Sequence, residues 1–321
     1  MKEMQYDLTI IIPHYNMPGD LIRLLDSIGR HDTVQIIVID DRSDAFLKEL
    51  EACKEKYDYA LFLQTEEGKK GAGAARNTGL DLAAGKWLLF ADSDDVFLPG
   101  WYEIVSAYMK TKYDLICFAP TSIRRDGSAS KRHLPYEKLV KNYLTSSYGG
   151  EERLRGHFTV PWSKLIRTSL VQQHQIRFDE VFYSADVMFS AKVGYYAETI
   201  TAVDTPFYCI IDHDDSMSRT KSSDVYFQRL QIYCERDNFY KNRFSKRKFE
   251  AYGRLSFLYS VKDTLQKGYG LKAIIGMGRI YRDNGIPFIV INCRKHMYGI
   301  ASLFFCRQHS QKQRPASDEK E

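Results

Sequence analysis

The sequence predicts an α/β fold with a mostly parallel sheet flanked by helices, followed by a mainly helical C-terminal region. Three observations predict this fold. Short apolar runs, typical of strands covered on both faces, alternate with helical segments over the first 100 residues. Two of these runs end in aspartates. From residue 221 onward, apolar residues recur at helical spacing among Lys and Arg.

Strands and helices alternate in order over the first 91 residues. The run LTIII (8–12) predicts a strand that Pro13 stops, and the helix predicted next covers 20–30, with Asp20 as its N-cap. The later elements are predicted as a strand at 34–39, a helix at 45–57, a strand at 59–63, a glycine-rich loop at 68–73, a helix at 74–85 with Gly85 at its C-cap, and a strand at 86–91. Such alternation is typical of a parallel sheet, whose ligands lie beyond the carboxyl ends of the strands.

The C-terminal region predicts helices at 225–243, 248–266 and 270–283. Residues 285–293 fit a short strand or a buried turn. Residues 296–306 fit an amphipathic segment that lies on a membrane or packs against the rest of the chain, and we expect a disordered tail after them.

Composition indicates a globular protein of one large domain or two ordinary ones, with 321 residues, 44% hydrophobic and 27% charged. Six scattered cysteines without a C-x-x-C pair argue against a zinc site and a disulfide framework, and they favour a reducing compartment. The N-terminus lacks a signal-peptide core, and no run reaches the roughly 18 apolar residues of a membrane-spanning helix. We therefore expect a cytoplasmic protein.

Charge is distributed unevenly within the net charge of +5. Residues 221–321 contain 20 Lys+Arg and 9 Asp+Glu, whereas the first 220 residues contain 26 and 32. A solvated surface, an anionic membrane face and nucleic acid all fit the basic end. No nucleic-acid module accompanies it, so we expect no nucleic-acid partner and keep peripheral contact with the inner face of the cell membrane as a prediction.

The stretch LLFADSDD (88–95) ends a predicted strand in Asp92, Asp94 and Asp95, and a second predicted strand ends in Asp40 and Asp41. Parallel strands end at the same edge of a sheet, so these carboxylates should lie near one crevice. Like charges this close raise each other's pKa unless a cation joins them, and Mg²⁺ or Mn²⁺ suits such oxygen ligands. An acidic turn that caps the next helix is the alternative.

Several segments in this order resemble family 2 glycosyltransferases, which have the GT-A fold and use nucleotide-sugar donors. The matching segments are IIIPHYN (10–16), IIVIDDRSD (36–44), GAGAARNTGLDLAAGKWLLFADSDD (71–95), PWSKLIRTSL (161–170), IRFDEVFYSADVMFSAKV (176–193) and PFYCIIDHDDSMSR (206–219). The resemblance implies a catalytic domain over 1–220, with a nucleotide-binding half at 1–100 and an acceptor-binding half at 101–220. The resemblance does not extend to residues 221–321, which are predicted as the basic helical region.

The resemblance also implies roles for single positions. It implies that Asp92 and Asp94 of the D-x-D motif are the metal ligands. The implied donor-binding positions are Pro13 and Tyr15 near the base, Asp41 bonding the base with Asp40 beside it, Gly73, Arg76 and Asn77 near the sugar and diphosphate, and Ser93 and Asp95 in the D-x-D turn.

Asp186 is the general base that the resemblance implies, although Ala185 stands where the family usually has Glu. His213 matches a region that sometimes supplies another metal ligand; a surface-loop histidine is the alternative. Trp162 and Lys164 lie in an acceptor-side element, where the tryptophan would stack on a sugar or pack in the core.

The implied reaction is the inverting transfer of a sugar from a nucleotide-sugar, of which a UDP-sugar is favoured, to a hydroxyl of a glycan or glycolipid acceptor. The resemblance places this reaction in bacterial cell-surface polysaccharide synthesis. Ala185 supports one alternative, a weak or inactive nucleotide-sugar-binding partner subunit. A nucleotidyltransferase shares acidic metal sites on similar sheets, but no glycine-rich loop follows the first predicted strand here.

Overall fold

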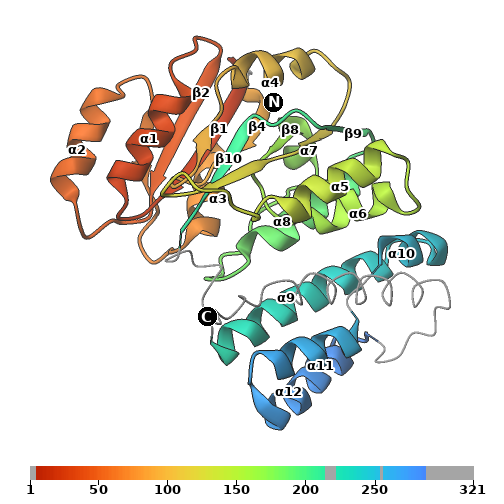
Figure 1. Cartoon of the computed structure of the whole chain (residues 1–321). Coiled ribbons are helices and arrows are strands. Elements are labelled where there is room, and N and C mark those ends of the chain that lie inside the picture. The colour runs from red at the N-terminus through yellow and green to blue at the C-terminus, as the bar shows by residue number, and fades with distance from the viewer. Residues whose placement is uncertain (1–4, 214–221, 254–255, 287–321) are drawn as a thin grey trace, which may run out of the picture.

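The computed structural model describes residues 5–213, 222–253 and 256–286 (Figure 1). The segment predicted at 296–306, the predicted disordered tail and most of the element predicted at 285–293 lie outside these residues. Within the described parts, no helix has both the length and the apolar character to cross a membrane.

A seven-stranded sheet forms the centre, with strand order β3-β2-β1-β4-β8-β6-β9. Only β8 runs antiparallel to its neighbours in this sheet as described, which confirms the predicted α/β class with a mostly parallel sheet. Its strands are β1 (Tyr6–His14), β2 (Val34–Asp40), β3 (Leu61–Gln64), β4 (Gly85–Phe90), β6 (Leu115–Phe118), β8 (Lys164–Arg167) and β9 (Ile200–Val203). A smaller sheet contains β5 (Val96–Phe97), β10 (Tyr208–Asp212) and β7 (Thr121–Arg124).

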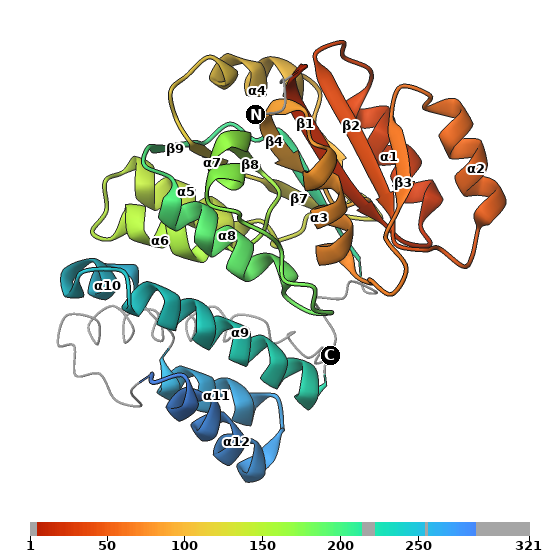
Figure 2. The same ribbon diagram turned by 180° about the vertical axis from the view of Figure 1, so that it is seen from behind.

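Helices cover both faces of the large sheet. Figures 1 and 2 show α1 (Pro18–Ile28) and α2 (Leu47–Lys56) on one face and α3 (Ala72–Leu82) on the other. Helix α1 forms because Leu21, Leu24, Leu25 and Ile28 recur at helical spacing, and all are at most 1% exposed. The other helices of this part are α4 (Trp101–Met109), α5 (Leu134–Leu144), α6 (Gly150–His157), α7 (Thr168–Gln173) and α8 (Ala185–Tyr196).

The helices of the described C-terminal residues form a further layer, which both views show beyond α5, α6 and α8. They are α9 (Ser223–Lys241), α10 (Lys246–Tyr252), α11 (Phe257–Gln266) and α12 (Gly270–Asp283). Tyr240 joins the layers, because its buried hydroxyl donates to the Ala191 carbonyl of α8 at 2.9 Å. Arg236 and Asp237 form a buried ion pair, 2.9 Å apart. The Asp237 carboxylate also accepts the Tyr252 hydroxyl at 2.7 Å, which fixes α10 to α9. The domain boundary at residue 220 stays a prediction.

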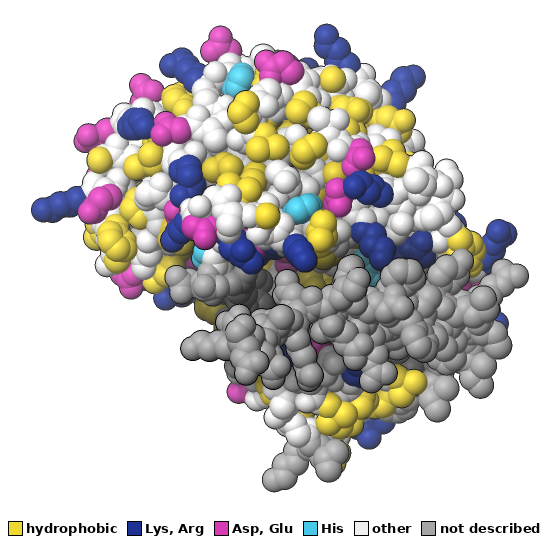
Figure 3. All heavy atoms as spheres, in the orientation of Figure 1, with side chains coloured by type: hydrophobic (Ala, Val, Ile, Leu, Met, Phe, Trp, Pro, Cys, Tyr) yellow, Lys and Arg dark blue, Asp and Glu magenta, His cyan; other side chains and the backbone are white. Residues whose placement is uncertain are grey.

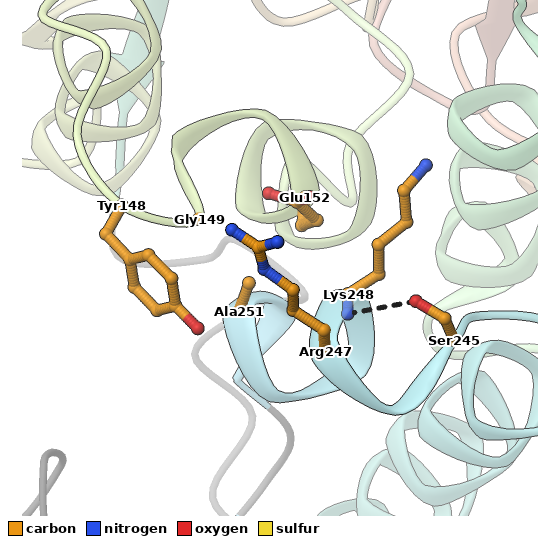
Figure 4. A pocket seen from close by; sticks show the side chains of 7 residues that line it. All are labelled: Tyr148, Gly149, Glu152, Ser245, Arg247, Lys248 and Ala251. Atoms are coloured by element: carbon orange, nitrogen blue, oxygen red, sulfur yellow. Dashed lines mark hydrogen bonds between the residues drawn. The ribbon is translucent and has the colours of Figure 1, made fainter.

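A hollow of about 340 Å³ lies between α6 and α10 (Figure 4). Tyr148, Gly149 and Glu152 line one side, and residues of α10 with its N-cap line the other. It contains none of the sequence-predicted site residues.

Several predicted element boundaries are wrong. The helix predicted at 20–30 begins at Pro18, so Asp20 lies in its first turn and is not its N-cap. Pro13 does not stop β1, because it pairs in register with Ile39 and the strand continues to His14. Neighbouring Ile11 turns its carbonyl to Ala91 on the β4 side, so the missing N–H of Pro13 faces that side, where the β1–β4 ladder has already ended.

Gly85 is not a C-cap, because it opens β4. A Cβ there would lie 2.4 Å from the Thr9 backbone nitrogen, so the glycine permits the close approach of β1. The single helix predicted at 248–266 is interrupted as well. Helix α10 ends before Gly253, whose φ of +74° suits a helix terminus, and α11 begins at Phe257.

Candidate active site

The carboxyl edge of the large sheet gathers the aspartates, as the sequence predicts. Strand β1 lies between β2 and β4, so Asp40 and Asp41 at the end of β2 flank the same edge as the turn after β4. In that turn, carboxylate oxygens of Asp92, Asp94 and Asp95 all lie within 4.8 Å of one another.

Asp95 anchors this turn to the smaller sheet. One of its oxygens accepts the Tyr208 hydroxyl at 2.7 Å, and the other accepts the Ile211 backbone N–H at 2.9 Å. The same hydroxyl accepts the backbone N–H of Asp92 at 3.0 Å. Burial, together with the nearby Asp94 and Asp92 carboxylates, holds the pKa of Asp95 well above its usual range. Both oxygens of Asp95 thus position the turn.

Asp92 and Asp94 each have one oxygen engaged by a neighbour. Arg76 donates to Asp92 Oδ1 at 2.6 Å, and His213 Nε2 lies 2.8 Å from Asp94 Oδ2. Burial raises the pKa of Asp92, and Arg76 opposes that rise. The other oxygen of each carboxylate has no hydrogen-bond partner among the described residues, which fits Mg²⁺ or Mn²⁺ held by one or two carboxylates together with phosphates and water. Ser93 is buried between them.

Asp40 faces inward. Its carboxylate accepts from His14 Nδ1 at 3.0 Å and from the Ser43 hydroxyl and backbone N–H. The Met17 N–H donates to His14 Nε2 at 3.2 Å, which assigns the ring proton to Nδ1. Burial raises the pKa of Asp40, but the hydrogen bonds from His14 and Ser43 outweigh burial and hold the pKa below its usual value. Asp40 thereby joins the loops that follow β1 and β2.

Asp41 and Tyr15 lie nearer the surface. Asp41 Oδ2 accepts the Gly71 N–H at 2.7 Å, and Oδ1 accepts the Thr65 hydroxyl at 3.2 Å, so Asp41 fixes the start of α3. Tyr15 is 44% exposed and its hydroxyl donates to Asp44 at 3.2 Å. An exposed ring at the rim offers a stacking surface for a base.

The start of α3 packs against the start of α8. A Cβ on Gly73 would lie 2.2 Å from the Asp179 carbonyl and 3.1 Å from the Ala185 Cβ, so only glycine allows this approach. Asn77 binds the intervening loop, since it donates to the Phe178 carbonyl at 3.0 Å and accepts the Phe178 N–H at 2.9 Å. Gly73 and Asn77 therefore set the position of α8.

Asp186 lies in the first turn of α8, where the contact with α3 brings it toward the acidic turn. Burial raises the pKa of Asp186 to about 6; Arg76 and Lys164 lower it, and Asp92 adds to the rise. A carboxylate with a pKa near neutrality is suited to accept a proton in catalysis. The structure thus brings Asp92, Arg76 and Asp186 into one electrostatic environment.

Lys164 and Trp162 are interior residues. Lys164 Nζ donates to the Phe158 carbonyl, and burial lowers the pKa of Lys164 to about 8. Trp162 is 4% exposed, and its ring stacks on Tyr208 with centroids 5.6 Å apart and contacts Tyr136 edge-on. Trp162 is therefore a packing residue rather than an exposed sugar platform.

Sequence reasoning missed two residues of the site. Tyr208 lies in a recognised segment, but an aromatic residue within a strand gives no sign of bridging two aspartates. Arg132 lies 3.9 Å from Asp212, and its charge lowers the pKa of Asp92. It follows β7 in a loop for which the sequence predicts no element, so no signal placed it here.

The chain matches a known family and many known proteins. The family model for glycosyl transferase family 2 matches residues 9–174, just over half of the chain. EpsH of Bacillus subtilis (strain 168), named as a glycosyltransferase, is 25% identical over 237 residues, which are 70% of this chain and 67% of EpsH. The chain spans 31% to 67% of the length of the first curated relatives that it matches.

Solved structures that resemble this one include complexes of two glycosyltransferases. Staphylococcus aureus TarS 1–349 in complex with UDP-GlcNAc has a TM-score of 0.56 and 17% identity, covering 81% of each chain. TarS is named as a poly(ribitol-phosphate) β-N-acetylglucosaminyltransferase. The mannosyltransferase PcManGT of Pyrobaculum calidifontis, in complex with GDP-Man and Mn²⁺, has a TM-score of 0.54 and 13% identity, covering 95% of this chain and 83% of PcManGT.

Proposed function

Because this chain belongs to glycosyl transferase family 2 and has the GT-A fold, it is a glycosyltransferase, and we propose that it transfers a sugar from a UDP-sugar to a hydroxyl of a glycan or glycolipid. We place this reaction in bacterial cell-surface polysaccharide synthesis. The UDP-GlcNAc bound by TarS and the polymer in the name of TarS support this choice. We assign catalysis to residues 1–220, with donor binding in 1–100 and acceptor binding in 101–220.

One observation carries the proposal: a half-buried carboxylate, Asp186, stands at the start of α8 within the electrostatic reach of Asp92 and Arg76. Asp92 itself belongs to the acidic turn, where a donor diphosphate would lie. The base and the leaving group are thus on different elements, α8 and the turn after β4. This division suits a single displacement, in which the acceptor attacks from the side opposite the diphosphate.

The proposed step inverts the anomeric carbon. The acceptor oxygen forms a bond to that carbon while the bond to the donor phosphate oxygen breaks, and the nucleoside diphosphate leaves with the electron pair. The proton of the acceptor hydroxyl passes to the carboxylate of Asp186. Arg76 holds Asp92 in place, and Tyr15 at the rim offers its ring to the base.

A divalent ion, bound by carboxylate oxygens of Asp92 and Asp94, would neutralise the diphosphate charge that develops during transfer. The Mn²⁺ in the PcManGT complex supports this assignment. His213 lies beside Asp94 and is the further candidate ligand.

We also propose where the enzyme acts. The described cysteines, Cys53, Cys117, Cys209 and Cys234, are free thiols. Free thiols are usual in the reducing cytoplasm, so we place the reaction there, where nucleotide-sugar donors would be consumed.

Incubation of the full chain with a panel of UDP- and GDP-sugars and Mn²⁺ tests the proposal, with release of the nucleoside diphosphate as the readout. We expect release from a UDP-sugar, and about 100-fold or greater loss in Asp186→Asn with donor binding retained. Donor binding without turnover in the wild type would instead favour the nucleotide-sugar-binding partner subunit that Ala185 suggests. No binding and no turnover with any donor would overturn both.

A further inference from the structure

The outer surface of α11 and α12 carries large apolar side chains in contact with solvent. Leu258, Tyr259 and Leu265 of α11 are 62%, 67% and 52% exposed, and Ile275 of α12 is 61% exposed. We propose that this surface, called here the α11–α12 face, docks the enzyme on an anionic lipid bilayer. The proposal goes beyond the transfer reaction and does not depend on which sugar is transferred.

Helix α11 has apolar side chains on both of its faces, since Phe257 and Val261 pack inward against the apolar cluster of α9 and α12. Its buried positions include the polar Ser260 and Thr264, at 4% and 0% exposure, while leucines at 258 and 265 point outward. The inner polar groups are satisfied locally, since Thr264 donates to the Ser260 carbonyl and the Ser260 hydroxyl bonds the Tyr281 hydroxyl at 2.8 Å. A water-facing helix normally places its polar residues outside, so this arrangement indicates a partner that accepts apolar side chains.

Basic residues share the outer positions with these apolar ones. Lys262 stands between Leu258 and Leu265 at helical spacing on α11, and Arg279 and Arg282 follow Ile275 on α12. Residues 256–286 contain five Lys+Arg but only two Asp+Glu. Both acids form ion pairs with nearby cations, Asp263 with Lys267 at 2.7 Å and Asp283 with Arg282 at 3.0 Å.

The surroundings of the face favour a bilayer. Figures 1 and 2 show α11 and α12 beyond α9, on the side away from the large sheet, and Figure 3 shows hydrophobic and basic side chains together at this end. Apolar side chains among cations match an anionic interface, where the apolar groups enter the headgroup boundary and the cations meet lipid phosphates. A second copy of the same face would bring like charges together. The sequence alone pointed to 296–306, which lies outside the described residues.

Flotation of the full chain with vesicles tests this proposal, using phosphatidylcholine alone and phosphatidylcholine mixed with phosphatidylglycerol. The test variant is Leu258→Glu with Ile275→Glu. The matched control is Phe46→Glu with Leu47→Glu, because these residues are 58% and 53% exposed at the start of α2. We expect wild type and control to bind the anionic vesicles, salt to weaken that binding, and the test variant to bind about tenfold more weakly or worse.

Absence of wild-type binding to anionic vesicles, or equal binding of the test variant and the control, would overturn the proposal. A dimer that the test variant dissociates, seen by light scattering without vesicles, would assign the face to a second copy instead. The far-UV circular dichroism spectrum and the thermal unfolding of each variant show whether it is folded. Since vesicle binding is read without turnover, it stands or fails separately from the proposed reaction.

Discussion

Replacing the proposed base should stabilise the fold at neutral pH, although it should abolish activity. Burial raises the pKa of Asp186 from a usual value of 3.8 to about 6. At 1.36 kcal/mol for each pH unit, keeping this carboxyl ionised in the folded chain costs about 3 kcal/mol. Because the folded pKa lies above the unfolded one, the carboxyl favours folding fully below about pH 4, and this contribution is lost as the pH rises through 6.

Asp186→Asn has no charge to bury, so we expect its free energy of unfolding to exceed that of wild type by about 3 kcal/mol near pH 8 and by roughly nothing near pH 4. Urea unfolding of both proteins at each pH measures this difference. Asp32→Asn, at an exposed position, makes the same chemical change and should alter stability little at either pH. A less stable Asp186→Asn near pH 8, or a gain that is equal at both pH values, would refute the electrostatic reasoning.

Three further predictions concern the hydrogen bonds that hold the acidic turn, the packing of α8 and the binding of UDP with Mn²⁺. Tyr208→Phe removes the bonds to Asp95 and to the Asp92 backbone, and should lower stability by about 2 kcal/mol in urea and raise the Mn²⁺ concentration for half-maximal turnover; an unchanged Mn²⁺ requirement would contradict the positioning role. Gly194→Ala places a Cβ 2.0 Å from the Arg155 carbonyl, and thermal unfolding should show a loss of at least about 2 kcal/mol. UDP with Mn²⁺ should raise the melting temperature more than either does alone, which a thermal-shift assay checks.

The sheet was predictable because buried parallel strands give a strong local signal. The runs at 8–12, 34–39 and 86–91 correspond to β1, β2 and β4, and each is nearly fully buried. The prediction was wrong at Gly85, because a glycine is common in more than one structural setting. Gly85 fits a helix end as well as a close strand contact, and only the neighbouring β1 decides between them.

The aspartates of the site were predictable for the same reason, since strand order brings their ends together without any detailed contact. Their partners were not. Tyr208 reaches Asp95 from a strand more than 100 residues later, and Arg132 reaches the site from a loop without a periodic pattern. Residues of this kind act through tertiary contacts between two distant segments, and neither segment alone records the contact.

Ala185 shows how such a contact bears on function. Its side chain is 6% exposed, and its Cβ lies 3.1 Å from where a Gly73 side chain would begin. Ala185 is therefore one of the residues at the close approach of α3 and α8. That approach places Asp186 toward the acidic turn. Ala185 is thus a packing residue between α3 and α8, and turnover by the wild-type chain decides between the enzyme and the partner subunit.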